Sequence, residues 1–167
     1  MDEGKAKAAP FDIENLPTRS FRCKIEGHKA IIFAPATKGE FPLVVLQHGF
    51  LMSIDFYSQL LLHISSYGYV VVAVQMYRPS GLPIFAPSTA DETRFAVQVI
   101  EWLRANINDK LSSMMSDIDV RVDVSRLALM GHSRGAKVVW GVAKDHPEIL
   151  RAVIGIDPVD GTGGPLG

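Results

Sequence analysis

The sequence has 167 residues, of which 47% are hydrophobic and 21% charged, and its formal net charge is −1. This length favours one domain with a sizeable core, and this composition excludes an intrinsically disordered chain. Because both signs of charge are scattered and no basic stripe occurs, the sequence gives no indication of nucleic acid or an anionic membrane surface as a partner. The single cysteine, Cys23, excludes an internal disulfide.

The first 20 residues predict a loose lead-in to a domain that we place at residues 21–167. The lead-in begins acidic and has no apolar region of the kind found in secretory signals. It also lacks the Arg-rich, acid-poor composition of an organelle transit peptide. No apolar run reaches the ~18 residues that a membrane-spanning helix needs.

Strand patterns dominate the first half of the domain. Residues 21–35 alternate apolar and charged side chains about a Gly-His pair, which predicts a hairpin, and residues 37–40 predict a loop. Residues 43–46 form a short apolar run, typical of a strand buried on both faces of a parallel sheet. Helical spacing predicts a helix over residues 55–67, and a Val-rich run predicts a strand over residues 69–74.

The second half begins with residues 78–90, where prolines among apolar side chains exclude a helix or a central strand. Packing, a cover over a site and contact with lipid are the open interpretations of this loop. Residues 91–111 predict the longest helix, capped by Thr89 or Asp91, and residues 111–123 predict an irregular polar connection. The remaining predicted segments are a strand at 126–130, a helix at 136–144, a strand at 151–156 and a Gly/Pro-rich tail at 162–167.

Strands that alternate with helices after a hairpin predict an α/β fold with a mostly parallel sheet and right-handed crossovers. In such sheets functional groups gather at the carboxyl ends of the strands. His48-Gly49, Ser133 and Asp157 each follow a predicted strand. We therefore expect them to share one edge of the sheet.

The segment Gly131-His132-Ser133-Arg134-Gly135 lies between a predicted strand and a predicted helix, which indicates a nucleophile elbow. The two glycines leave room where a β-carbon would collide with the neighbouring strand and helix. The N–H of Arg134, at the helix N-terminus, can donate to a developing oxyanion. The alternative is a chance Gly-x-Ser-x-Gly in a strand–helix turn.

His48 and Gly49 follow the strand at 43–46, where hydrolases of this architecture place a second oxyanion donor. The backbone N–H of Phe50 or of Leu51 is the candidate donor. The alternative is that Gly49 only serves a tight turn, which His48 orients.

These segments resemble the α/β-hydrolase superfamily and, more narrowly, the plant chlorophyllases. The features that carry the resemblance are residues 131–135, 155–161, 39–60 and 68–73, and the likeness extends from about residue 20 to 163. The sequence departs from the family motif at Ala136, where that motif usually has a second glycine.

The resemblance implies hydrolysis of the phytyl ester of chlorophyll to chlorophyllide and phytol, with Ser133 as nucleophile and Asp157 as triad acid. Asp160 competes for the acid role, but Asp157 follows the predicted strand directly. The resemblance implies no cofactor and no metal of the enzyme's own. It implies a chloroplast location, whereas the lead-in leaves a cytosolic location open. Peripheral contact with a membrane is one of the open interpretations of the apolar loop at 78–90.

The expected catalytic base is missing from the sequence. α/β-Hydrolases place the histidine after the acid, but all five histidines precede Asp157: His28, His48, His63, His132 and His146. We expect His132 to point away from Ser133, His48 to belong to the oxyanion side and His146 to lie at the far end of its helix. The sequence therefore predicts an α/β-hydrolase domain that lacks its last strands, as a fragment of a longer hydrolase would.

Two other functions remain open at this point. One is a generic carboxylesterase or lipase that accepts other hydrophobic esters. The other is a truncated, non-catalytic protein that binds a pigment or lipid, which the missing histidine favours and the retained Ser133 and Asp157 oppose.

Overall fold

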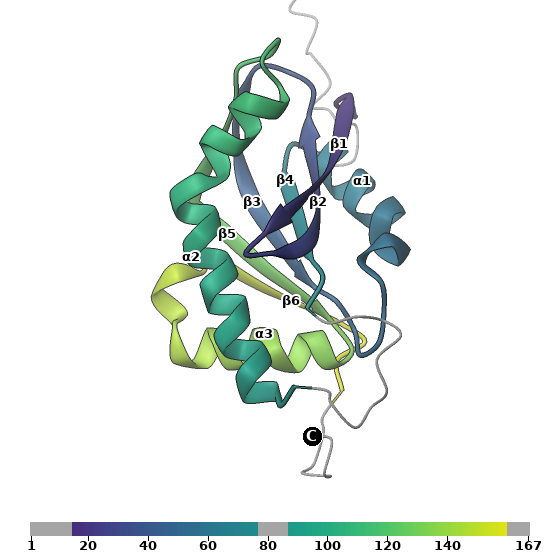
Figure 1. Ribbon diagram of the computed structural model, residues 1–167, viewed down its shortest axis with the longest axis vertical. Coiled ribbons are helices and arrows are strands. Elements are labelled where there is room, and N and C mark those ends of the chain that lie inside the picture. Colours follow the sequence, from purple (N-terminus) through teal and green to yellow (C-terminus); the bar gives the residue numbers. More distant parts are fainter. Residues whose placement is uncertain (1–14, 77–86, 160–167) are drawn as a thin grey trace, which may run out of the picture.

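Six strands form one sheet in the order β1-β2-β4-β3-β5-β6 in the computed structural model (Figure 1). The structure describes residues 15–76 and 87–159. Most of the predicted lead-in, most of the predicted 78–90 loop, Asp160 and the predicted tail lie outside the described residues.

The strands β1 and β2 are antiparallel, and β2 is antiparallel to β4, whereas β4, β3, β5 and β6 run parallel to their neighbours. The carboxyl ends of four strands therefore meet at one edge, as predicted for a mostly parallel α/β sheet. The strand bounds are Thr18–Ile25, His28–Pro35, Gly39–Gln47, Val70–Val74, Val120–His132 and Ala152–Ile156 for β1 to β6.

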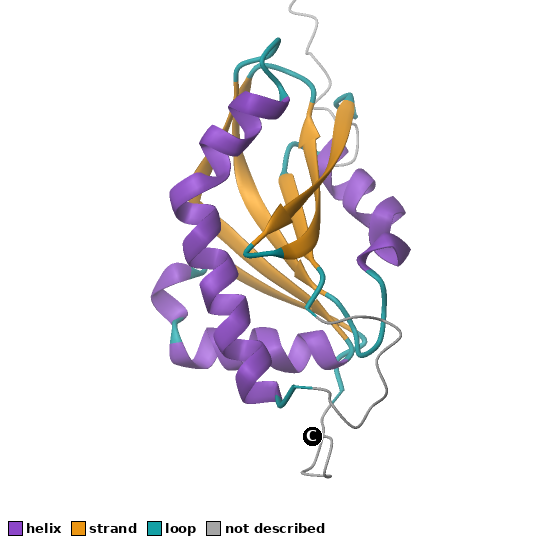
Figure 2. Ribbon diagram, in the orientation of Figure 1, coloured by secondary structure: helices purple, strands orange, loops and turns teal. Residues whose placement is uncertain are grey.

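Helices cover both faces of the sheet (Figure 2). The helices α2 and α3 lie on one face and α1 on the other, and each face has its own apolar cluster. In β3, Leu43 and Val45 face α2 and α3, while Val44 and Leu46 face α1, so this strand is buried on both faces as predicted. The helix bounds are Ile54–Tyr57 (η1), Ser58–Ser66 (α1), Thr89–Met114 (α2), Arg134–Asp145 (α3) and Pro147–Ile149 (η3).

The prediction of an irregular connection over residues 111–123 was wrong at both ends of that range. The helix α2 continues to Met114, and β5 begins at Val120. Residues 120–123 pair with residues 39–42, which begin inside the predicted 37–40 loop. Val120 and Val122 are buried, but their alternation is too short to stand out locally, and only the pairing with β3 makes it a strand.

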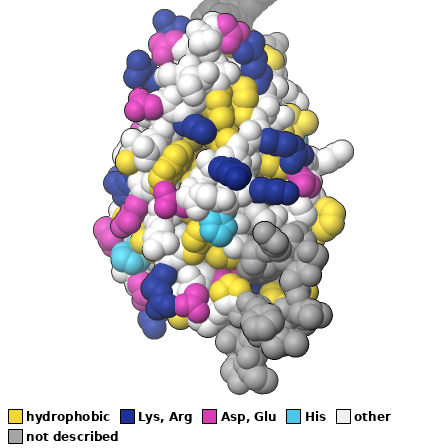
Figure 3. All heavy atoms as spheres, in the orientation of Figure 1, with side chains coloured by type: hydrophobic (Ala, Val, Ile, Leu, Met, Phe, Trp, Pro, Cys, Tyr) yellow, Lys and Arg dark blue, Asp and Glu magenta, His cyan; other side chains and the backbone are white. Residues whose placement is uncertain are grey.

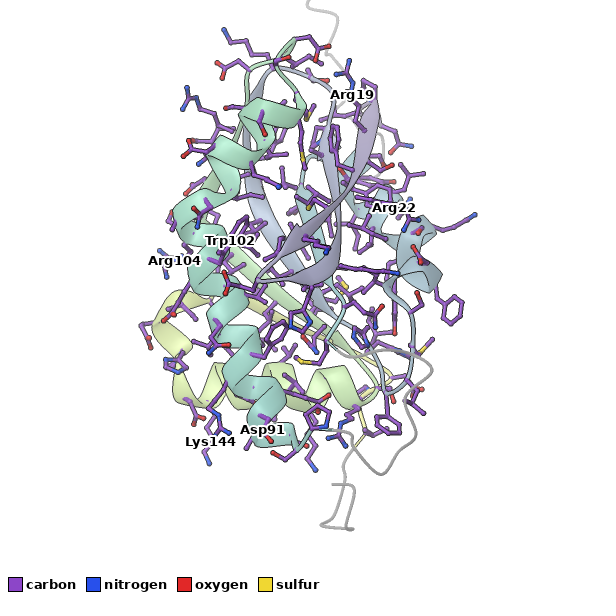
Figure 4. All side chains as sticks on the ribbon, viewed as in Figure 1. Arg19, Arg22, Asp91, Trp102, Arg104 and Lys144 are labelled. Atoms are coloured by element: carbon purple, nitrogen blue, oxygen red, sulfur yellow. The ribbon has the colours of Figure 1, made fainter. Side chains whose placement is uncertain are left out.

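The cap of α2 also differs from the prediction. Ser88 is the N-cap, and its side chain and that of Asp91 form a capping box. Thr89 is already inside the helix. Figure 4 shows Asp91 at the lower end of α2, where α2 crosses in front of α3.

Charged side chains of both signs are scattered over the face that bears α2, as Figure 3 shows. Of the helices in the described part of the chain, none is long and apolar enough to cross a membrane.

Candidate active site

Ser133 occupies the tight turn between β5 and α3. Its backbone has φ 51° and ψ −121°, a conformation that side-chain-bearing residues rarely adopt. The Ser133 N–H donates to the carbonyl of Ile156 at 3.0 Å, which fastens the turn to the end of β6. Strain of this kind, held by the surrounding structure, is what a nucleophile elbow requires.

The two glycines of the pentapeptide are required by close backbone approaches. A β-carbon on Gly131 would lie 2.4 Å from the carbonyl oxygen of Gly135, in the first turn of α3. A β-carbon on Gly135 would lie 2.3 Å from the carbonyl oxygen of Gln47, at the end of β3. The predicted steric reason for both glycines is thus confirmed. The close approach at Gly135 brings the elbow directly against the loop that follows β3.

Asp157 lies beside the elbow because β6 pairs with β5 up to His132 and Ile156. Asp157 is exposed and has φ 44°, so the chain turns sharply as soon as the strand ends. The fold thus brings a carboxylate and the predicted nucleophile to adjacent strand ends. Asp160, its predicted competitor, lies outside the described residues.

His48 is fully buried and holds the loop after β3. Its Nδ1–H donates to the carbonyl of Gly49 at 2.8 Å, and its Nε2 accepts the N–H of Met76 at 2.9 Å. Burial lowers the pKa of His48, and the bond to Gly49 opposes this shift. His48 is therefore a neutral imidazole that orients the loop, and with both nitrogens occupied it is not a free base.

Gln75, which the sequence analysis did not single out, secures the same loop. Its Oε1 accepts the N–H of Ile54 at 3.0 Å, and its Nε2 donates to the carbonyl of Met52 at 3.0 Å. The position of Gln75 directly after a Val-rich strand could have indicated this role, because a glutamine buried there needs hydrogen-bond partners for its amide.

Phe50 and Leu51 follow Gly49 in this loop. The Arg134 guanidinium carbon lies 5.4 Å from the centroid of the Phe50 ring. Leu51 has φ 55°, a second strained position at the site. The structure therefore brings the loop with the predicted second oxyanion donor to the residue that carries the first.

The Arg134 side chain connects the elbow to α2. Its Nε lies 2.6 Å from Glu92 Oε2, and one of its terminal nitrogens donates to the Pro87 carbonyl at 2.8 Å. The Glu92 side chain is only 2% exposed and that of Arg134 12%. Burial raises the pKa of Glu92, and the guanidinium of Arg134 opposes this rise. Neither partner was predicted to form a buried ion pair.

The other four histidines are not placed as a base for Ser133. His132 Nδ1 lies 2.8 Å from the Tyr57 hydroxyl. His28 is half-buried against Phe95, and three strand spacings of about 4.8 Å separate its strand from β5. His63 is exposed on α1, and His146 caps the carboxyl end of α3, a helix about 18 Å long.

Potential metal ligands do not cluster in this site. Within residues 15–76 and 87–159, no three His, Cys, Asp or Glu side chains lie together so that they could hold a metal ion.

Ser133 is a strained serine between a strand and a helix of a mostly parallel sheet, and a loop of candidate oxyanion donors lies beside it. Together these features define an α/β-hydrolase. A sequence model of the chlorophyllase family matches residues 1–165. The chain belongs to the chlorophyllase family, which is one of carboxylic ester hydrolases.

Individual relatives agree with this assignment. Chlorophyllase-2 of Arabidopsis thaliana is 38% identical over 98% of this chain and 52% of its own length. The protein named chloroplastic chlorophyllase-1 of Citrus unshiu is 37% identical over 79% of this chain and 37% of its own length. The cutinase Est1 of Thermobifida alba is 25% identical over 92% of this chain and 47% of its own length. The chain thus spans about half the length, or less, of these curated relatives.

Proposed function

We propose that this chain carries the nucleophile and oxyanion half of a serine ester hydrolase that cleaves the phytyl ester of chlorophyll. The observation that carries the proposal is the strained backbone of Ser133, held between β5 and α3 beside the end of β6. The relatives named chlorophyllase suggest the substrate, since chlorophyll is a hydrophobic ester. If chlorophyll is the substrate, the chloroplast is the compartment in which the chain works.

In this mechanism Ser133 Oγ attacks the ester carbonyl carbon, and its proton passes to a base. The carbonyl oxygen becomes an oxyanion that accepts from the N–H of Arg134 and from that of Phe50 or Leu51. The bond to the phytyl oxygen then breaks, and phytol leaves with the proton. Water attacks the acyl-enzyme, releasing chlorophyllide and restoring the serine hydroxyl.

Asp157 is the proposed acid of the triad, because it follows the strand next to the one that bears Ser133. An acid in this role fixes the tautomer of a histidine and stabilises its protonated form. The histidines of this chain are engaged or placed elsewhere, as described above. We therefore propose that the base comes from polypeptide outside these 167 residues.

Two other functions have observations in their favour. The similarity to a cutinase supports a broader esterase, and in that case short p-nitrophenyl esters would turn over faster than chlorophyll. The absence of a placed base supports a non-catalytic pigment-binding protein. In that case chlorophyll would bind without turnover, and Ser133→Ala would bind it equally well.

The first test is fluorophosphonate labelling of the purified chain mixed with the carboxyl-terminal half of a chlorophyllase relative, which would supply the base; the probe phosphonylates only an activated serine as fluoride leaves. Ser133→Ala should abolish labelling, and Ser113→Ala, at an exposed position on α2, should leave it unchanged. Labelling that persists in Ser133→Ala would refute Ser133 as the nucleophile. Chlorophyllide release should then be measured with the chain alone and with the carboxyl-terminal half of a chlorophyllase relative added. No chlorophyllide in either sample, despite specific labelling, would favour the broader esterase.

A further inference from the structure

The Tyr57 hydroxyl joins the two segments that form the proposed oxyanion hole. Tyr57 ends η1, is only 7% exposed, and accepts the Gly49 N–H at 2.9 Å. The same oxygen lies 2.8 Å from His132 Nδ1. Gly49 immediately precedes Phe50, and His132 immediately precedes Ser133. One hydroxyl group therefore connects the residue before a proposed oxyanion donor to the residue before the proposed nucleophile.

The protons of this network can be assigned from its donors. The Gly49 amide can only donate, so the Tyr57 oxygen accepts from it and has one proton left to give. Its possible acceptors are His132 Nδ1 and the sulfur of Met52 at 3.3 Å. Sulfur is a weak acceptor, so the proton belongs on the bond to Nδ1.

This assignment has a consequence for the oxyanion hole. The Gly49 N–H is already used by Tyr57 and is not an oxyanion donor. The proposed candidates for the second donor are therefore the next amides in the loop, those of Phe50 and Leu51. Their position relative to Ser133 depends on how Gly49 is held.

The hydrogen bonds of His48 and Gln75, on the other side of the loop, do not connect the loop to the end of β5. His48 and Gln75 fasten the loop to the end of β4, through Met76, Met52 and Ile54. Tyr57, in contrast, fastens it to the end of β5. The His132 ring also lies tightly against the loop, since a β-carbon on Gly49 would come within 2.9 Å of Nδ1.

We propose that Tyr57 is a positioning residue whose hydroxyl holds the amides of the 49–51 loop in place relative to Ser133. This inference rests on the proposed function of Ser133. Oxyanion donors stabilise a transition state only when they are held close to the ideal geometry, and misplacement by 1 Å can cost about 100-fold in rate.

The test is Tyr57→Phe, which removes one oxygen and keeps the ring in its packing. Its control is Tyr67→Phe, because Tyr67 is 37% exposed at the end of α1. The second-order rate constant for fluorophosphonate labelling of Ser133 should fall by about 10- to 100-fold in Tyr57→Phe. It should be unchanged in Tyr67→Phe. Equal rates in wild type and Tyr57→Phe would overturn the inference while leaving the nucleophile intact.

Amide hydrogen exchange separates positioning from general destabilisation. In Tyr57→Phe, exchange at residues 49–51 should rise while exchange in the core of α2 stays at its wild-type rate. A rise spread evenly over the chain would mean that the hydroxyl only stabilises the fold, and would overturn the inference. If wild-type Ser133 is not labelled even with the carboxyl-terminal half of a chlorophyllase relative added, the proposed function fails, and the exchange at residues 49–51 alone decides the role of Tyr57.

Discussion

Removing the charge of Glu92 should destabilise the protein far more than its position in the first turn of a helix suggests. Glu92→Gln keeps the size of the side chain but leaves the Arg134 guanidinium without its carboxylate. Breaking a buried ion pair by removing one partner costs about 3–5 kcal/mol. Arg134 keeps its bond to the Pro87 carbonyl and is 12% exposed, so we expect the lower end of this range, about 3 kcal/mol.

Equilibrium urea unfolding measures this loss directly, provided that the m-value stays constant. The control is Asp117→Asn, which breaks the exposed ion pair between Arg19 and Asp117. Exposed pairs contribute little, so the control should unfold at nearly the wild-type midpoint. Equal midpoints for Glu92→Gln and Asp117→Asn would refute the reasoning.

A double substitution tests the physical cause of the loss. Replacing both partners of a buried ion pair with apolar side chains of similar volume is often neutral or stabilising, because no charge is left unpaired. Glu92→Leu combined with Arg134→Met should therefore recover most of the stability that Glu92→Gln loses. If the double variant is less stable than Glu92→Gln, packing rather than an unpaired charge explains the effect.

Three further predictions concern the capping of α2, the loop after β3 and the elbow. Ser88→Ala should lower the free energy of unfolding by about 1 kcal/mol, whereas Thr89→Ala, at one of the two caps that the sequence suggested, should lower it less in the same urea titration. Burial lowers the pKa of His48 from its ordinary 6.5, so as the pH falls the His48 side chain of the unfolded protein takes up a proton before that of the folded protein does. The free energy of unfolding should therefore decrease as the pH falls below 6.5, by at most about 1.4 kcal/mol per pH unit. Replacing the exposed His63 with Gln should leave this pH dependence unchanged. A pH dependence that disappears in the His63→Gln variant would contradict its assignment to His48. Gly135→Ala should cost at least about 4 kcal/mol, measured by the same unfolding assay, because its β-carbon would collide with the backbone of β3; a stable Gly135→Ala protein would contradict the packing described.

The local part of the site could be predicted from the sequence. The proposed nucleophile elbow is encoded in a continuous segment, and the steric need for Gly131 and Gly135 follows from the strand–turn–helix order alone. The positions of His48 and Asp157 at strand ends also follow from local order, because parallel strands end at a common edge.

The supporting contacts could not be predicted, since they join residues far apart in sequence. Tyr57 and His132 are 75 positions apart, and Glu92 and Arg134 are 42 apart. Locally, Glu92 has the pattern of a favourable charge at a helix N-terminus, and Tyr57 that of an apolar residue at helical spacing. Nothing in either neighbourhood distinguishes a positioning contact from ordinary packing.

The start of β5 could not be predicted for the same reason, because it depends on a segment far away in the sequence. Residues 120–123 alternate over only four positions, and the matching residues 39–42 contain Gly39 and Pro42. Each segment alone favours a loop. Each becomes a strand because the other supplies its hydrogen-bond partners, which is a tertiary effect that overrides local propensity.

The proposed nucleophile depends on β6 as well as on its base. The Ser133 N–H bonds to the Ile156 carbonyl, so the strained turn is secured by this strand. Among the described strands β6 pairs only with β5, and Ile154 on it is 37% exposed. An edge strand of this kind opens more readily than a central one. Polypeptide that paired with β6 would therefore stiffen the elbow as well as bring a base to it, and a histidine supplied without such pairing should restore less activity than one supplied with it.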